Sequence, residues 1–503
     1  MVLNFNNVFL MKALTVDELG ACIGKMCCNT DHISDVTSHH QETHHAGMIL
    51  KLAQLNRCTT RLSPTNIIPT RIKRNLSGII MGVETSCDDT CVALLTTEGK
   101  ILSSEVSSQY AIHNPFGGIK PNHAARAHEA NLPFVMGNPF PSNFFSQSVE
   151  SALKKAGMKD LSLVSGVAVT RGPGLRGSLE VGLAFVKQLC REHNLPLLPV
   201  HHLEAHALTV RLPQRETSTT SGREAEPVEF PYITVLVSGG HSQLLLCEGV
   251  MKYRLLGGTV DDSLGESYDK VARLLGMTYE EGGKGLEKLA VEGDPQRYKL
   301  PRPLYKVKKS CDWSFSGLKN AVNLLLASIR EEEGIPKEAN MVQTSRKTAA
   351  DIAACFQNTA LEHIITSTER GIDYCTINLD VQPESVVVCG GVASNERLRG
   401  MLREMAKRKQ MKIHYPPVRL CTDNAVMVAW AAIEGMRAGN IDIIRPEEAR
   451  FDEVESSVND PKIRVKSCQI TPIPRWPLDR EDGMHPFGVV YPQQSYKKRR
   501  GEI

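Results

Sequence analysis

The sequence predicts an α/β protein in which one strand-rich unit occurs twice, with a ligand cleft between the two copies. Residues 78–108 contain an apolar strand, a polar loop, a second strand, a turn at Glu98–Gly99 and a third strand. Residues 230–258 repeat this plan about 150 residues later. Stretches with helical periodicity lie between and after the two copies. Strands with interposed helices are typical of α/β proteins with mixed sheets.

The order of these elements predicts the domain organisation. The first copy opens a subdomain at residues 79–227, which also holds inserted helices, and the second opens a subdomain at residues 228–445. A polar linker at residues 215–229 separates the two copies. Residues 446–503 are predicted to be a C-terminal tail. Helices are predicted where apolar residues recur every three to four positions, at residues 178–193, 316–333, 348–370 and 424–439.

Composition and charge exclude several classes of protein. A chain of 503 residues is too long for one compact core, and 41% apolar with 23% charged residues is ordinary for a globular protein. No apolar run approaches the roughly 18 residues that span a bilayer, so no membrane association is expected. The 14 cysteines lack the spacing of a disulfide framework and are expected to be reduced intracellular thiols. Because the net charge is only +3, any nucleic-acid surface must be a local patch.

The N-terminal residues have a composition of their own. Residues 48–78 are rich in arginine and hydroxyl groups and contain no acid, which predicts a mitochondrial transit peptide and a location in the matrix. A disordered basic tail is the alternative. Residues 1–47 are acidic on balance and are interpreted as a disordered leader or a gene-model extension, with translation starting at Met48. N-terminal sequencing that found residues 1–47 retained in the organelle would contradict this start.

The stretch LPVHHLEAHALTV at residues 198–210 holds a candidate metal site. His202 and His206 are four residues apart, so on a helix both imidazoles face one side and can reach one cation. A structural pair of histidines is the alternative. A zinc-protease motif places its general base directly after the first histidine, whereas Glu204 lies about 200° around the helix from His202. The segment therefore lacks the base that a protease needs.

Three turns that follow apolar strands predict nucleotide binding. In VSGGHS, Gly239 and Gly240 can present backbone N–H groups to a phosphate. The Gly390–Gly391 turn and Asn395 suit the sugar and base edge of a nucleotide, and Asp88 in ETSCDDT could hold a cation or orient a nucleophile. RGPGLRG at residues 171–177 matches a dinucleotide-binding pattern, but the next strand ends in histidine and not in an acid. Its glycines are therefore expected to allow close packing at a helix N-terminus.

Eight motifs occur in the order and spacing of one known family. They are GVETSCDDT, RGPGLRGSLEVG, HHLEAH, VSGGHS, SYDKVARLLGM, SFSGLKNA, GGVASN and CTDNAVMVAW, and they cover about residues 79–439. The chain thereby resembles the TsaD-like tRNA threonylcarbamoyltransferases, formerly called sialoglycoprotein endopeptidases. With its transit-like segment it resembles their mitochondrial branch. The resemblance implies a duplicated actin-like ATPase fold, with ribonuclease H-like subdomains as in sugar kinases and heat-shock chaperones, and a ligand cleft between them.

The resemblance also implies an activity and partners. Members of the family transfer a threonylcarbamoyl group from threonylcarbamoyl-AMP to N6 of the adenosine that is 3′-adjacent to the anticodon in tRNAs reading ANN codons. A separate synthase would supply the adenylate, tRNA would bind as substrate, and a homodimer is expected. An ATP-dependent small-molecule kinase of the same fold, a nucleotide-binding chaperone or scaffold, and a metalloprotease are the alternatives. Neither the kinase nor the chaperone would need a metal-binding triad.

Site residues are implied wherever the motifs match. The resemblance implies one divalent cation per subunit, zinc or iron, bound by His202, His206 and Asp423. Without the resemblance, Asp423 would be interpreted as a helix cap. Asp88 is the candidate to align the incoming amine. The residues implied for the adenylate are Ser238, Gly239, Gly240, His241 and Ser242 around the phosphate, Asp269 on the ribose, and Gly283, Glu287, Ser394 and Asn395 nearby.

The chain departs from the family pattern at two places. Asp89 stands where glutamate is usual, which shortens that side chain by one methylene. YEEGGKG at residues 279–285 replaces the usual YPGGP, with one extra residue and Lys284 in place of proline. The register at Gly283 and Glu287 therefore depends on where the extra residue is placed. Candidates for contacts with tRNA phosphates, with exposed helix charges as the alternative, are Arg126, Arg171 and Arg176.

Overall fold

A computed structural model describes residues 78–132, 147–213, 228–307, 310–332, 345–446 and 470–478. Contacts within the chain divide it into residues 1–74 and residues 75–503, and every described residue belongs to the second unit. The predicted leader lies outside the described residues, as does the predicted transit peptide apart from Gly78. Within the described ranges, no helix has both the length and the apolar character needed to cross a membrane.

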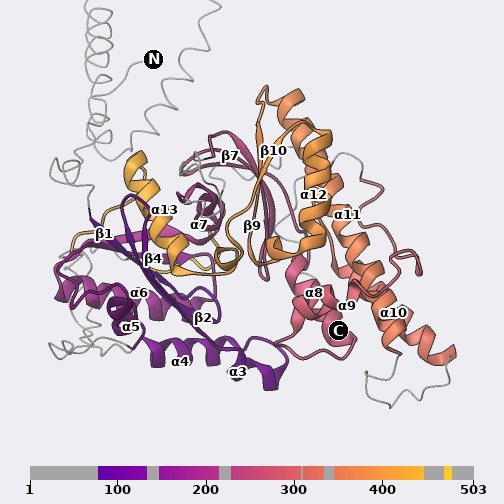
Figure 1. Ribbon diagram of the computed structural model, residues 1–503, viewed down its shortest axis with the longest axis horizontal. Helices are drawn as coiled ribbons and strands as arrows, with labels where there is room; N and C mark the ends of the chain where they lie inside the picture. Colours follow the sequence, from indigo (N-terminus) through magenta and orange to yellow (C-terminus); the bar gives the residue numbers. More distant parts are fainter. Residues whose placement is uncertain are drawn as a thin grey trace, which may run out of the picture. The chain divides into compact units, whose positions relative to one another are not determined.

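The first sheet contains the N-terminal copy of the repeated unit as β1–β3, followed by β4 and β5 (Figure 1). Its strand order is β3-β2-β1-β4-β5. β2 runs antiparallel to the other four strands, which all run in one direction. The central position of β1 allows it to be buried on both faces, which accounts for its nearly continuous apolar sequence. The strands are β1 (Ile79–Glu84), β2 (Asp89–Thr96), β3 (Ile101–Ser108), β4 (Val164–Gly172) and β5 (Leu197–His201).

The second sheet repeats the first strand for strand. Its order is β10-β9-β6-β7-β8. β7 runs antiparallel to the other four strands, which all run in one direction. In chain order the two sheets therefore have the same topology, which confirms the duplicated actin-like α/β fold. The strands are β6 (Tyr232–Val237), β7 (Ser242–Gly249), β8 (Lys252–Gly258), β9 (Ser385–Cys389) and β10 (Lys412–His414).

The longer helices match the predicted periodic stretches closely. α6, α10, α11 and α13 begin and end within a few residues of the predictions, except that α11 continues eight residues beyond residue 370. The α-helices are α3 (Tyr110–His113), α4 (Pro121–Asn131), α5 (Gln147–Lys155), α6 (Arg176–Glu192), α7 (His202–Leu208), α8 (Leu264–Leu274), α9 (Gly282–Ala290), α10 (Ser316–Glu332), α11 (Arg346–Asn378), α12 (Glu396–Arg408) and α13 (Ala425–Ala438). The 3-10 turns are η3 (Asn114–Phe116), η4 (Thr209–Arg211), η5 (Gly391–Ser394) and η6 (Val418–Leu420).

Helices cover both faces of the first sheet. Side chains alternate between the faces of a strand, so Met81 and Val83 of β1 pack with residues of α5 and α6, whereas Ile80 packs with α13. Gly82 also faces α13, and a Cβ atom there would overlap the carbonyl oxygen of Ala425. The glycine therefore lets the start of α13 lie directly on β1. This contact fixes the residues just before α13, which include Asp423.

The second sheet is covered by α8–α12 on one face and by α7 on the other. Ile233 and Val235 of β6 belong to the core with the long helices, whereas Tyr232 and Leu236 pack against Leu203 of α7. α7 also contacts β4 and β5 of the first sheet and lies against α13. This short helix is therefore held between the two repeats.

α13 follows the second repeat in the chain but packs on the first sheet. Its sequence is apolar on nearly all sides, and all of its residues from Ala425 to Gly435 are buried. Such a helix needs neighbours all around it, which the position between β1, β2 and α7 provides. The subdomain boundaries at residues 79–227 and 228–445 stay a prediction.

Candidate active site

The predicted metal ligands converge at the N-terminal ends of α7 and α13. β5 ends at His201 and α7 begins at His202, so His202 and His206 lie one helical turn apart with ring centroids separated by 4.8 Å. Oδ1 of Asp423 lies 3.0 Å from Nε2 of His206 and 3.6 Å from Nε2 of His202. One ligand atom from each of the three residues lies within 4.8 Å of the others. Two imidazoles and one carboxylate are a donor set that suits zinc or iron.

The capping interpretation of Asp423 does not fit the geometry. The N-cap of α13 is Asn424, whose Oδ1 accepts a hydrogen bond from the backbone N–H of Met427 at 2.9 Å. The carboxylate of Asp423 is left to face the two histidines. The helix cap and the candidate ligand are therefore adjacent residues with separate roles.

A buried glutamate that the sequence analysis did not select supports His202. Glu84 is the last residue of β1 and is fully buried, and its Oε2 lies 3.4 Å from Nδ1 of His202. The backbone N–H of Ser86 and the hydroxyl of Thr170 donate to the Glu84 carboxylate, and the Ser86 hydroxyl also lies 3.3 Å from His202 Nδ1. A carboxylate on the second ring nitrogen is the usual means of orienting a metal-binding histidine.

The electrostatics of this cluster favour a cation. Burial acts to raise the pKa of Glu84, but the charge of His202 lowers it below its ordinary value. Burial likewise opposes the change at Asp423, whose pKa is lowered by His202 and His206. Burial acts to lower the pKa of His202, but Asp423 and Glu84 together raise it to about 9. One fully buried and one partly buried carboxylate thus favour a positive charge between them, which a proton on His202 or a metal ion can supply.

Glu204 occupies the opposite side of α7, as its spacing predicted. Its Oε1 accepts hydrogen bonds from the backbone N–H of Met251 at 2.7 Å and from the hydroxyl of Tyr253 at 3.0 Å. The carboxylate is therefore engaged away from the His202 and His206 side chains. The geometry does not support a role for Glu204 as the base of a protease.

The loop from Ser238 to Ser242 closes on itself and leaves its two glycines uncovered. The backbone N–H of Ser238 donates to the carbonyl of His241 at 2.7 Å, and the hydroxyl of Ser242 accepts from the N–H of Leu264 at the start of α8 at 2.9 Å. Gly239 and Gly240 are exposed, and a Cβ at either would meet no described atom within 4 Å. Their lack of side chains is not explained by packing within the described residues, whereas close approach of a ligand to the backbone would explain it.

His241 brings this loop next to the candidate metal ligands. Its ring centroid lies 6.2 Å from that of His202. Burial, reinforced by the charge of His202, lowers the pKa of His241 to about 4. The ring is therefore neutral at physiological pH and can donate one hydrogen bond.

The turn after β9 lies beside the same loop. A Cβ on Gly390, which has a φ of +90°, would overlap the carbonyl oxygen of Val237, and Gly391 faces the methyl group of Thr422. The VSGGHS loop, the Gly390–Gly391 turn and the residue before Asp423 are thus adjacent. The Ser394 hydroxyl donates to the Gly391 carbonyl at 2.7 Å.

The remaining residues implied for the adenylate lie on α8, on α9 and just before α12. Oδ1 of Asp269 on α8 accepts from the backbone N–H of Gly283 at 2.9 Å, and burial raises the pKa of Asp269. Glu287 on α9 accepts from the N–H of Glu396 at 2.7 Å. Asn395 is buried and caps α12 through a 2.8 Å hydrogen bond from Leu398 N–H. Asn395 therefore has a structural task in addition to any contact with a nucleotide.

Asp88 faces the second repeat from the loop after β1. The hydroxyl of Tyr279 donates to Oδ2 of Asp88 at 3.4 Å, and burial raises the pKa of Asp88. Burial and the charge of Asp88 raise the pKa of Asp89 to about 7. Burial, with the nearby charges of Asp89, Asp88, Asp269 and Asp423, also raises the pKa of Tyr110 to about 12. These carboxylates would repel a phosphate unless a bound cation offset their charge.

The three arginines considered for RNA contacts differ in their surroundings. Nε of Arg171 donates to the carbonyl of Thr471 at 3.0 Å, and its guanidinium lies over the ring of Trp476. Arg176 forms an exposed ion pair of 2.8 Å with Glu180 on the next turn of α6. Arg126 is exposed on α4. Arg171 is thus committed to the protein itself.

Comparisons with known proteins identify the family. The model for TsaD, tRNA N6-adenosine threonylcarbamoyltransferase, matches residues 100–430. The chain belongs to the TsaD family. A relative from Arabidopsis thaliana, named probable tRNA N6-adenosine threonylcarbamoyltransferase, mitochondrial, is 37% identical over 404 residues, which cover 80% of this chain and 75% of the relative. The tRNA N6-adenosine threonylcarbamoyltransferase of Granulibacter bethesdensis is 39% identical over 408 residues, covering 80% and 95%.

The matched region of this TsaD-family chain contains all three candidate metal ligands but begins after Glu84 and Asp88. Among solved structures, an activator of 2-hydroxyisocaproyl-CoA dehydratase from Clostridium difficile with bound ADPNP is 16% identical. The alignment has a TM-score of 0.37 and covers 72% of this chain and 96% of the activator.

Proposed function

We propose that this protein transfers the threonylcarbamoyl group of threonylcarbamoyl-AMP to N6 of the adenosine 3′-adjacent to the anticodon in mitochondrial tRNAs that read ANN codons. Family membership supports the reaction class. The single structural observation that carries the proposal is the convergence of His202, His206 and Asp423 beside the open Gly239–Gly240 loop. A kinase of the same fold needs the loop but does not need the triad.

The proposed reaction is an acyl transfer. The bond between N6 and the carbamoyl carbon forms, the bond from that carbon to the phosphate oxygen breaks, and AMP leaves with the electron pair while N6 loses a proton. When bound, a zinc or iron ion supplies Lewis acidity for the carbonyl oxygen. We propose that His202, His206 and Asp423 hold this ion, one per subunit, and that Glu84 orients His202.

The protein's other groups bind and position the two substrates. The backbone of Gly239 and Gly240 is proposed to hold the adenylate phosphate, with His241 as a neutral donor. Asp269 would hold the ribose, while Gly283, Glu287, Ser394 and Asn395 surround the nucleotide. Asp88, on the opposite repeat, would align the amine of the incoming adenosine. Because that amine is weakly basic, positioning and charge stabilisation are expected to supply most of the rate enhancement.

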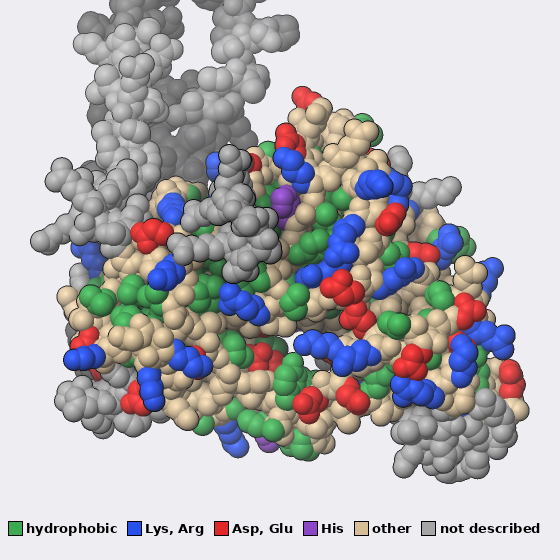
Figure 2. All heavy atoms as spheres, viewed as in Figure 1, with side chains coloured by type: hydrophobic (Ala, Val, Ile, Leu, Met, Phe, Trp, Pro, Cys, Tyr) green, Lys and Arg blue, Asp and Glu red, His purple; other side chains and the backbone are tan. Residues whose placement is uncertain are grey.

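The proposed partners follow from the same reaction. tRNA is the acceptor, a separate synthase supplies the adenylate, and a homodimer stays a prediction. On the face shown in Figure 2, Lys and Arg side chains are interspersed with Asp and Glu, so this view offers no extended basic surface for RNA. The name of the Arabidopsis relative supports a mitochondrial location for this chain, and we propose the matrix, where mitochondrial tRNAs are modified.

A reconstitution tests the proposal. The full chain is combined with a threonylcarbamoyl-adenylate synthase, ATP, threonine, bicarbonate and an ANN-decoding tRNA, and the digested tRNA is examined by mass spectrometry. We expect threonylcarbamoyladenosine only when the chain is present, and none with a tRNA whose acceptor adenosine is replaced by guanosine. No product despite confirmed adenylate and bound metal would contradict the proposal. ATP consumption that depends on an added sugar or similar alcohol would then favour the kinase.

A further inference from the structure

Residues 470–478, which we call the C-terminal strap, connect the cores of the two repeats. The strap belongs to the region that the sequence predicts to be a tail. Ile470 at one end is buried in the core formed by the first sheet with α5 and α6. Leu478 at the other end is buried with Leu203 and Ala207 of α7 and with Tyr232 of β6. The strap is therefore anchored at both ends, and one anchor lies against α7.

Between its ends the strap is hydrogen-bonded to the end of β4 and to the loop that follows it. The N–H of Ile473 donates to the carbonyl of Arg171 at 2.9 Å, and the N–H of Gly174 donates to the carbonyl of Pro474 at 3.2 Å. Gly172 has no room for a side chain because a Cβ there would overlap the Ile473 carbonyl oxygen. The same loop donates from Leu175 N–H to the carbonyl of Ser86 at 2.7 Å. Ser86 in turn contacts His202, so this loop links the strap to the metal site.

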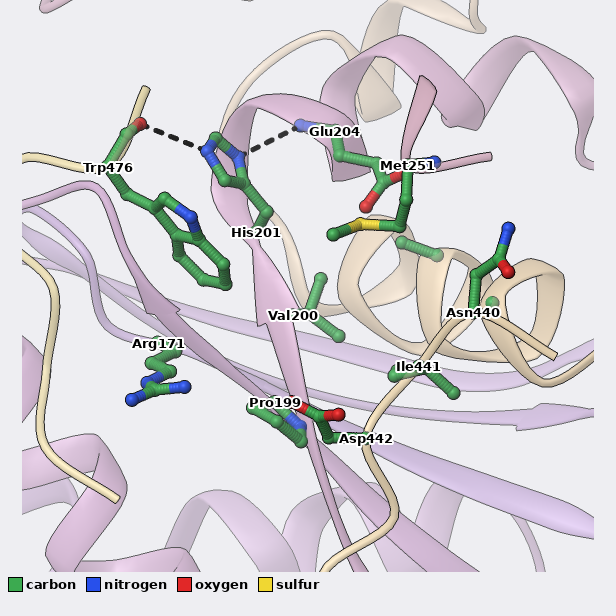
Figure 3. A pocket seen from close by; sticks show the side chains of 12 residues that line it. Arg171, Pro199, Val200, His201, Glu204, Met251, Asn440, Ile441, Asp442 and Trp476 are labelled. Carbon is green, nitrogen blue, oxygen red and sulfur yellow. Dashed lines mark hydrogen bonds between the residues drawn. The ribbon is translucent and has the colours of Figure 1, made fainter. Parts of the chain in front are cut away.

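A second link runs through His201, the N-cap of α7. Its Nδ1 accepts from the backbone N–H groups of Leu203 at 3.2 Å and Glu204 at 3.4 Å. A nitrogen that accepts cannot carry the proton, so the proton lies on Nε2, which donates to the carbonyl of Trp476 at 3.0 Å. The imidazole also packs against the Trp476 indole, with centroids 4.6 Å apart. Figure 3 shows two of these hydrogen bonds, with Trp476 and with Glu204, on opposite nitrogens of the His201 imidazole.

These hydrogen bonds lie beside a space and not within a continuous core. His201, Glu204, Arg171 and Trp476 all line a cavity of about 110 Å³ (Figure 3). The residues at the start of α7 are buried, but on this side its first turn borders a cavity. α7 has only seven residues, and so short a helix depends on its cap and its neighbours.

We propose that His201 is a positioning residue, held in one tautomer by the Trp476 carbonyl. Through His201 the strap fixes the first turn of α7 and thereby the orientation of the His202 and His206 side chains. The inference rests on the proposed metal role of these two histidines. It assigns a task to a segment after α13 that the transfer reaction itself does not use. Removing the His201 cap lets the first turn of α7 loosen, which separates the two metal-binding imidazoles from Asp423.

Zinc affinity and hydrogen exchange test this proposal on the full chain. His201→Phe keeps an aromatic ring but cannot accept from α7, whereas His201→Asn restores a capping acceptor. A third variant ends the chain at residue 469. The matched control is Leu326→Ala, a buried change on α10, which lowers thermal stability far from α7. The dissociation constant for Zn²⁺ alone is measured by competition with a chromophoric chelator, and exchange of the α7 amides is measured on metal-free protein.

We expect His201→Phe and the shortened chain to bind Zn²⁺ about 10- to 100-fold more weakly and to exchange the α7 amides faster. His201→Asn should recover part of the affinity, and Leu326→Ala should bind as wild type despite its lower Tm. Wild-type affinity in His201→Phe, or an equal loss in Leu326→Ala, would overturn the proposal. If the shortened chain does not fold, the two His201 variants still test the proposal.

Failure of the metal site and failure of the strap are distinguishable. Wild type that binds Zn²⁺ no better than His206→Ala would contradict the proposed metal site. Exchange of the α7 amides in metal-free His201→Phe does not depend on that result. If the α7 amides of metal-free His201→Phe exchange at the wild-type rate, that result alone would overturn the proposed role of the strap.

Discussion

His206→Ala is expected to abolish metal binding and to lower the rate of threonylcarbamoyl transfer by about 1,000-fold or more. His206 is the histidine whose Nε2 lies closest to Asp423, at 3.0 Å, and its loss leaves only His202 and Asp423 of the triad. A Lewis acid contributes several kcal/mol to a transition state, and each 1.36 kcal/mol is a factor of ten in rate. Metal content of the purified protein and the rate of product formation in the reconstituted reaction check both expectations.

His193→Ala is the matched control, because it removes an exposed histidine that follows α6. It should keep both metal and activity. Transfer at the wild-type rate by metal-free His206→Ala would contradict the assigned ligand set. So would a variant that loses activity but retains one metal ion per subunit.

Glu84→Gln is expected to weaken metal binding about 10- to 100-fold, the effect usual for losing the carboxylate behind a metal-binding histidine. Gln has the same shape and can still accept from Ser86 N–H, so the fold should persist. What is lost is the negative charge 3.4 Å from Nδ1 of His202. The pKa of His202 should fall with it, and the ring should be less well oriented. Competition with a chelator measures the affinity, and circular dichroism checks the fold.

Glu204→Gln is the control for Glu84→Gln. It makes the same substitution at another buried glutamate, but on the side of α7 that faces Met251 and Tyr253. It should leave metal affinity and transfer close to wild type. A loss of metal affinity equal to that of Glu84→Gln would show that the effect of Glu84 is not specific to His202. If Glu204→Gln lost activity but retained its metal, Glu204 would again be a candidate general base.

The strands and long helices could be predicted because their signals are local. The two copies of strand, loop and hairpin have period-two or continuous apolar patterns, and α10 and α13 lie where the helical periodicity predicted them. The packing of α13 on the first sheet could not be predicted in this way. It depends on a close approach between Gly82 and Ala425, residues far apart in the chain. Periodicity indicates that a helix is buried but not which sheet buries it.

The parts of the candidate site that lie within recognisable sequence motifs could be predicted. The spacing of His202 and His206 placed both on one helix face, and the spacing of Glu204 placed it on the other, as the structure has them. From the sequence alone, Asp423 could be a metal ligand or a helix cap, because the spacing does not reveal that Asn424 is the N-cap of α13. Glu84 was missed, although an acid that ends a wholly apolar strand was a usable signal. The contacts of the strap had no signal, since residues 470–478 have neither helical nor strand periodicity.

The most direct test of the central claim is metal removal and return in the reconstituted transfer reaction. The purified chain is stripped with a chelator, and transfer is measured as Zn²⁺ or Fe²⁺ is added back, in parallel with Asp423→Asn. We expect metal-free protein to make no threonylcarbamoyladenosine. We also expect one equivalent of metal to restore the wild-type chain and Asp423→Asn to stay inactive at the same metal concentration. Full transfer by the stripped wild-type chain would contradict the claim that His202, His206 and Asp423 act through a bound metal ion.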